Sequence, residues 1–121
     1  MKPVRGAGKK NGNGASAREL ARDFLDVRDV AAAYVMLAER GRPGEVYNVA
    51  SGQGISLQEL FDRLAAIVGV DAIAEPDPAF LRPADLPYLV GDAAKLRAAT
   101  GWAPGIALEQ TLRDLVHAQA D

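Results

Sequence analysis

The stretch RDFLDVRDVAAAYVMLAERGRPGEVYNV, residues 22–49, decides the fold that we expect for this chain. It opens with a short apolar, extended stretch, and Asp26 then stands where a helix N-cap is expected. Apolar residues recur at helical spacing from there, which predicts an amphipathic helix over residues 27–40. The sequence Gly-Arg-Pro-Gly ends that helix. Residues 46–49 then predict a short, largely buried strand.

A second helix follows a short turn. Ser56 and Glu59 form a capping box, in which the serine caps a backbone N–H and the glutamate reaches back. An apolar face follows, so we predict a helix over residues 56–68 that Gly69 ends. Residues 71–75 predict another short strand.

The last third of the chain predicts an irregular segment and two helices. Four prolines lie in residues 75–87, so this segment is expected to run extended or to turn. Asp92 is expected to cap a helix that runs to about Thr100. Apolar spacing predicts a final helix over residues 108–119.

The predicted fold class is mixed α/β (α+β), with a small sheet of two or three short strands and about four helices. Sheets usually have about four to six strands, so we expect that part of a larger sheet is missing. The length of 121 residues suits one compact domain. We assign it to residues 18–121 and expect residues 1–17, rich in glycine and lysine, to form a flexible basic tail.

Composition excludes several classes of protein. Apolar residues make up 49% of the chain and charged residues 25%, which is typical of globular proteins. There is no cysteine, so disulfides and thiolate metal sites are excluded. Basic residues gather in the tail and the body is acidic, which argues against nucleic-acid binding. No apolar run approaches the roughly 18 residues of a membrane span. We expect a cytoplasmic protein without a membrane partner.

Four blocks of sequence stand in order over roughly residues 20–120: RDFLDVRDV (22–30), GEVYNVASG (44–52), LRPAD (81–85) and GWAP (101–104). Together they resemble the carboxy-terminal part of the extended short-chain dehydrogenases, the NAD-dependent epimerase/dehydratase family that acts on sugar nucleotides. Within that family, their sequences are most similar to those of GDP-mannose 4,6-dehydratase and GDP-4-keto-6-deoxy-mannose reductase.

The resemblance implies the substrate-binding lobe of a Rossmann-type enzyme without its amino-terminal Rossmann domain. In that family, the amino-terminal part binds NAD(P) and supplies a catalytic Tyr-x-x-x-Lys pair. Here Tyr34, Tyr47 and Tyr88 are followed four residues later by Ala, Ser and Asp. Residues 12–17 match G-x-G-x-x-A by letter, but no buried strand precedes them. We therefore expect no catalytic residue, no cofactor-binding residue and no bound cofactor in this chain.

The resemblance also implies a site for a nucleotide diphosphate. Arg22 and Arg82 would contact the diphosphate or its neighbouring ribose, with Asp85 near them. Forked arginine donors suit a diphosphate because they bind its oxygens in pairs. The alternative is that Arg22 pairs with Asp23 or Asp26 and that Arg82 is simply solvated.

Three other features have two interpretations each. The Ser-Gly-Gln-Gly turn at residues 51–54 could cradle an anion, but we favour a tight turn whose donors Ser56 satisfies. Trp102 is expected to pack against the final helices rather than to stack on a base. His117 has no second ligand at a suitable spacing, so we expect a surface residue and no metal site.

Two functions remain open at this point. The chain is either a truncated lobe that binds a nucleotide sugar such as a GDP-sugar, or a non-enzymatic module, derived from that lobe, that forms oligomers. Apolar surface that packs on the Rossmann sheet in the family would favour a homo-oligomer. Whether the chain is an enzyme is left undecided by the sequence.

Overall fold

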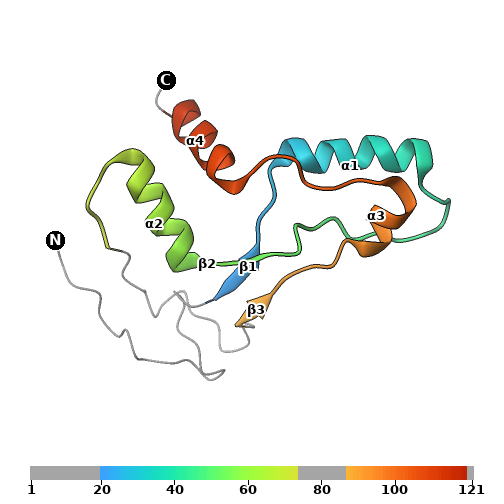
Figure 1. The fold of residues 1–121 in the computed structure, drawn as a ribbon, viewed down its shortest axis with the longest axis horizontal. Helices are drawn as coiled ribbons and strands as arrows, with labels where there is room; N and C mark the ends of the chain where they lie inside the picture. Colours follow the sequence, from blue (N-terminus) through green and yellow to red (C-terminus); the bar gives the residue numbers. More distant parts are fainter. Residues whose placement is uncertain (1–19, 74–86, 120–121) are drawn as a thin grey trace.

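The computed structural model of the chain describes residues 20–73 and 87–119 (Figure 1). The predicted tail over residues 1–17 and nearly all of the proline-rich segment lie outside these ranges. The described elements, in chain order, are β1 (Ala21–Asp23), α1 (Val27–Arg40), β2 (Gly54–Ser56), α2 (Leu57–Val68), β3 (Tyr88–Leu89), α3 (Ala94–Thr100) and α4 (Leu108–Gln119).

The three strands form one small mixed sheet with β1 in the centre. Their order is β2-β1-β3, and β1 pairs antiparallel with β2 and parallel with β3. Arg22, in the middle of β1, lies opposite Ile55 on one side and Leu89 on the other. The predicted mixed α/β class, with a small sheet and four helices, is confirmed.

Helix α1 has the predicted bounds. The Asp26 carboxylate accepts a hydrogen bond from the backbone N–H of Arg28 at 2.8 Å, so it caps the helix as predicted. At the other end, the N–H of Gly41 donates to the carbonyl of Leu37 and the chain turns extended. The local sequence therefore determines where α1 begins and ends.

Helix α2 begins at one half of the predicted capping box. The Ser56 hydroxyl accepts a hydrogen bond from the N–H of Glu59 at 3.0 Å. The Glu59 carboxylate does not reach back but accepts a hydrogen bond from Arg63, one turn along the helix. Gly69 ends the helix in the left-handed conformation, with φ of 84°.

The last two helices agree with the sequence except at one cap. The Asp92 carboxylate accepts a hydrogen bond from the N–H of Ala94, but the helix N-cap is Ala93, one residue later than predicted. Gly101 ends α3 with φ of 79°. Helix α4 has the predicted bounds of Leu108 and Gln119.

The predicted strands are wrong, and the strands that the structure has were not predicted. The first strand lies at Ala21–Asp23, just before the apolar stretch over residues 24–27, for which the sequence predicted an extended conformation but no strand. Residues 46–49 and 71–73 are not in strands. A strand needs a partner with which to form a ladder, and apolar, β-branched composition does not supply one. One of the two ladders to β1 among the described residues is made by Gly54–Ser56, where the sequence predicted a turn and a helix cap.

The buried core lies between α1, α3 and the segment that joins α1 to β2. Leu96 is fully buried, with 0% exposure, and packs with Trp102 and three alanines. Helix α1 packs against α3, and α2 packs against α4. Figure 1 shows these pairs at opposite ends of the fold, with the small sheet below and between them. None of the described helices is long and apolar enough to cross a membrane.

The burial of the core predicts that alanine substitutions at two leucines lower the free energy of unfolding by different amounts. Leu96→Ala leaves a cavity in the buried cluster, so we expect the free energy of unfolding to fall by about 2–5 kcal/mol. Leu115→Ala is the matched control, because Leu115 is 50% exposed on α4, and should cost less than about 1 kcal/mol. Urea unfolding followed by circular dichroism measures both. Equal losses would show that Leu96 does not anchor the core.

Candidate functional site

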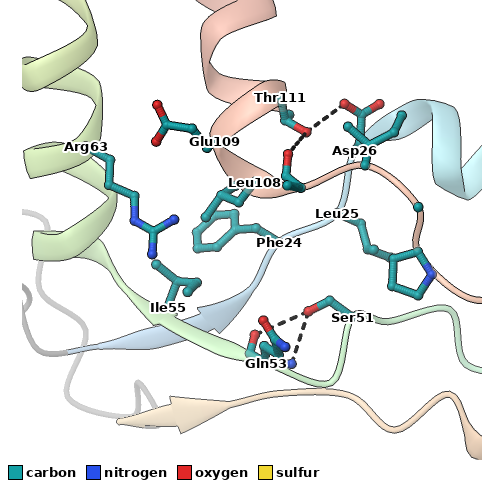
Figure 2. Close-up of a pocket in the computed structure, with 14 residues that line it drawn as sticks. Phe24, Leu25, Asp26, Ser51, Gln53, Ile55, Arg63, Leu108, Glu109 and Thr111 are labelled. Atoms are coloured by element: carbon teal, nitrogen blue, oxygen red, sulfur yellow. Dashed lines mark hydrogen bonds between the residues drawn. The ribbon is translucent and has the colours of Figure 1, made fainter.

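Two hollows flank the apolar stretch that follows β1. The first, which we call the interhelical hollow, has a volume of about 500 Å³ and lies at the ends of α2 and α4 (Figure 2). Figure 2 shows the Phe24 ring in its middle, with Arg63 from α2 on one side and Leu25 on the other. Its lining residues are Phe24, Leu25, Asp26, Ser51, Gln53, Ile55, Arg63, Pro104, Gly105, Ile106, Ala107, Leu108, Glu109 and Thr111.

Asp26 and Thr111, which both line the interhelical hollow, are bound to each other. The buried Asp26 carboxylate accepts hydrogen bonds from the Arg28 guanidinium and, at 2.7 Å, from the Thr111 hydroxyl. Arg28 also pairs with Asp114 on α4. Hydrogen bonds from Arg28 and Thr111 hold the pKa of Asp26 well below its ordinary value. This network links the start of α1 to α4 and so stabilises the packing of these two helices.

The second hollow contains the predicted ligand-binding arginine, and we call it the Arg22 hollow. Its volume is about 550 Å³. Arg22 is partly buried, and its Nη1 donates to the carbonyl of Ala21 at 2.8 Å. Asn48 is an exposed residue that lines the same hollow. The lining residues are Arg22, Asp23, Leu25, Val30, Asn48, Val49, Ala50, Leu89, Val90 and Gly91.

Asp23 bonds to the segments that form this hollow. Its Oδ1 accepts a hydrogen bond from the N–H of Ser51 at 2.8 Å. Its Oδ2 accepts hydrogen bonds from the N–H of Gly52 at 2.9 Å and of Gly91 at 3.3 Å. The chain bends at Gly52 and Gly54 already belongs to β2, and the predicted acceptor is wrong, because Asp23 rather than Ser56 accepts hydrogen bonds from Ser51 and Gly52.

These hydrogen bonds determine the charge state of Asp23. Partial burial would raise the pKa of the carboxyl, but the hydrogen bonds from Ser51, Gly52 and Gly91 outweigh it and lower the pKa. Asp23 is therefore an anion at neutral pH, directly beside the Arg22 cation in the sequence.

Two glycines let the walls of the Arg22 hollow approach closely. A Cβ at Gly91 would lie 2.6 Å from the Cβ of Ala50, which is closer than two carbon atoms can pack. A Cβ at Gly54 would lie 2.7 Å from the ring of Tyr88 and 2.9 Å from Val90. A larger residue at Gly91 would push residues 50 and 91 apart, whereas at Gly54 it would displace the side chains of Tyr88 and Val90.

The structure describes only one of the three predicted site residues. Arg22 lies in the hollow, whereas Arg82 and Asp85 are outside the described residues. The Asp26 carboxylate, a possible partner of Arg22, is bound by Arg28 and Thr111 instead.

Two other expectations about single residues are confirmed. Trp102 is buried in the core, and its Nε1 donates to the carbonyl of Asp29 at 2.9 Å, so it has a packing role. His117 is exposed on α4. No cluster of metal-ligating side chains occurs in the part of the chain that the structure describes.

Sequence reasoning missed Asp23 as an organiser of the site. A turn with two glycines leaves backbone donors that need an acceptor, and the sequence offered Ser56 as the nearest one. Asp23 lies 28 residues before Ser51, and only the fold brings the two together. The exposed position of Asn48 was missed for a similar reason, because residues 46–49 were predicted as a buried strand.

Known proteins are similar to this chain in sequence and in fold. Residues 7–115 match the family described as GDP-mannose 4,6 dehydratase. The chain belongs to this family. The resemblance to the carboxy-terminal part of the extended short-chain dehydrogenases is thereby confirmed.

Members of the wider family align over most of this chain. GDP-6-deoxy-D-mannose reductase of Pseudomonas aeruginosa is 43% identical over 98 residues, which are 81% of this chain and 32% of the reductase. The structure of RMD from Pseudomonas aeruginosa complexed with NADPH matches at a TM-score of 0.74 and 40% identity, over 83% of this chain and 33% of that one.

A more distant structure matches equally well in shape. UDP-glucose 4-epimerase from Thermotoga maritima with UDP-glucose has a TM-score of 0.74 and 29% identity, over 86% of this chain and 34% of that one. In each case the sequence spans about a third of the relative's length.

The network around Asp26 predicts a dependence of stability on pH. Because the folded-state pKa of Asp26 is lowered, the carboxylate stabilises the fold above the unfolded-state pKa. That stability is lost as the pH falls from about 5 toward the folded-state pKa. In Asp26→Asn this position no longer titrates, so the unfolding free energy should fall less steeply between about pH 6 and pH 3. Urea titrations at each pH measure it.

The exposed Asp71 supplies the matched control for this experiment. Asp71→Asn removes the same charge and should keep the slope of the original chain. If Asp26→Asn also keeps that slope, Asp26 does not contribute to the acid sensitivity of the fold.

Proposed function

We propose that this chain is the nucleotide-sugar-binding lobe of an NAD(P)-dependent dehydratase, reductase or epimerase. The observation that carries the proposal is the position of Arg22 in the wall of an open hollow of about 550 Å³ at the central strand of the sheet. We further propose that the ligand is a GDP-sugar, because the sequence matches the GDP-mannose 4,6 dehydratase family.

The chemistry of the Arg22 hollow supports a diphosphate ligand. A guanidinium binds phosphate oxygens through paired, charge-assisted hydrogen bonds. Strand β1 is the central strand, paired on both sides, so the backbone that carries Arg22 is held firmly. The amide of Asn48 adds a donor and an acceptor to the same hollow, suited to a ribose hydroxyl or a phosphate. By resemblance, Arg82 and Asp85 complete this site.

We do not propose that this chain catalyses a reaction by itself. No tyrosine in the sequence is followed by lysine four residues later. The chain covers about a third of each relative that it matches, and one of these relatives is named as a complex with NADPH. We propose that NAD(P) is held by the part of such an enzyme that lies outside the matched third. The appropriate assay is therefore ligand binding rather than turnover.

The proposal predicts that GDP binds at Arg22. Amide NMR shifts during a GDP titration should change at Arg22, Asn48 and their neighbours. Arg22→Ala should weaken binding by about tenfold or more, because a charged hydrogen bond to the diphosphate is lost.

Arg97→Ala is the control for charge, because Arg97 is an exposed arginine on α3, away from the hollow. It should bind GDP as the original chain does. The proposal fails if saturating GDP shifts no amide around the hollow, or if both arginine variants bind equally well.

A second candidate function is self-association, and the surface of α1 favours it. The nine residues from Val30 to Ala38 are all apolar, yet Ala33 alone among them is buried. Tyr34 and Val35 are 64% and 60% exposed on this helix, and an uncovered stripe of this kind usually marks an interaction surface. We propose that two copies of the chain pair through α1.

This candidate predicts a homodimer that one charge disrupts. Val35→Asp places a carboxylate in the apolar stripe, so light scattering should report a monomer where the original chain gives a dimer. Val68→Asp is the matched control, because Val68 is 55% exposed on α2, and should leave the dimer intact. A monomeric mass for the original chain at high concentration would rule out this mode of association.

A further inference from the structure

We infer that Asp23 is a positioning residue for the ligand site in the Arg22 hollow: its carboxylate holds two walls of the hollow against the strand that carries Arg22. The inference rests on the proposed function, since it concerns the same site. It adds a residue that no resemblance to the family assigned.

The walls of the hollow come from three separate segments. Strand β1 carries Arg22, residues 48–50 form a second wall, and residues 89–91 form a third. The ladder between β1 and β3 fixes the third wall at Leu89. Residues 48–50 are not in a strand, so no ladder among the described residues fixes the second wall.

Asp23 bonds to both of these walls at their ends. Ser51 and Gly52, which follow the second wall directly, donate to Asp23 Oδ1 and Oδ2 at 2.8 and 2.9 Å. Gly91, the last residue of the third wall, donates to Oδ2 at 3.3 Å. One carboxylate next to Arg22 therefore sets how far both walls stand from the arginine.

Direct packing limits how closely the second and third walls can approach each other. A Cβ at Gly91 would lie 2.6 Å from the Ala50 Cβ, so the second and third walls already touch beside Asp23. Ala50 is itself buried in the core. The hydrogen bonds hold both walls at Asp23, and this contact sets how closely the second and third walls approach each other.

The charge of Asp23 separates positioning from simple electrostatics. A carboxylate beside Arg22 repels a bound diphosphate, so removing its charge would strengthen binding if electrostatics alone mattered. Asparagine keeps the size of the side chain, but its amide nitrogen cannot accept hydrogen bonds from backbone N–H groups. A positioning role therefore predicts the opposite sign, with weaker binding after Asp23→Asn.

The decisive experiment compares GDP affinity in Asp23→Asn, Asp71→Asn and the original chain by NMR titration. We expect Asp23→Asn to bind GDP about tenfold more weakly, the change that loss of a charged hydrogen bond gives, and the exposed Asp71→Asn to bind normally. Binding to Asp23→Asn that equals or exceeds that of the original chain overturns the inference.

A second variant tests the role of the carboxylate itself. Asp23→Ala leaves space for an added anion, so sodium formate should restore GDP affinity, while sodium chloride at the same ionic strength should not. The absence of this difference contradicts the inference.

Amide hydrogen exchange tests the role of Asp23 without relying on GDP binding. If the original chain binds no GDP, the proposed function fails, but exchange at Ser51 and Gly52 still tests Asp23. We expect exchange there to rise by about tenfold or more in Asp23→Asn, because the acceptor of both N–H groups is weakened, with no change along α4. Unchanged exchange at both residues would refute the positioning role.

Discussion

Buried and partly buried carboxylates that accept hydrogen bonds from distant segments are the interaction on which this fold depends. Asp23, Asp26 and Asp29 stand three residues apart around the start of α1. Asp23 binds the backbone at residues 51, 52 and 91, Asp26 binds the hydroxyl of Thr111, and Asp29 accepts from the N–H of Ile106 at 3.0 Å. Seven residues of chain, 23–29, thus bind the backbone or side chains of residues 51–52, 91, 106 and 111.

The physical reason is the requirement that buried backbone donors be paired. A three-stranded sheet of two- and three-residue strands satisfies few of them, and the long segments between its elements must find acceptors elsewhere. A carboxylate accepts several hydrogen bonds at once, and those bonds stabilise its charge. Asp29 shows the result most clearly, since its side chain and its carbonyl together hold the loop that follows Trp102.

Two surfaces of the molecule differ in how well their residues are held. The walls of the Arg22 hollow are held by hydrogen bonds to the Asp23 carboxylate, and two of them are in contact at Ala50 and Gly91. The outer face of α1 is apolar and uncovered, and the extended segment at residues 46–49 has no ladder among the described residues. The chain covers about a third of the length of each relative that it matches.

The sequence by itself determined the helices, because caps, glycine stops and apolar spacing are local: Asp26, Ser56, Gly69 and Gly101 act within a few residues of their position. It also determined the family, through blocks that can be read in order. The tertiary structure alone decided the strands, since a ladder depends on which segment lies alongside and not on apolar composition. It decided the site for the same reason: Arg22 could be named from its block, but the acceptor for the turn at residues 51–52 is 28 residues away, and no local pattern encodes that contact.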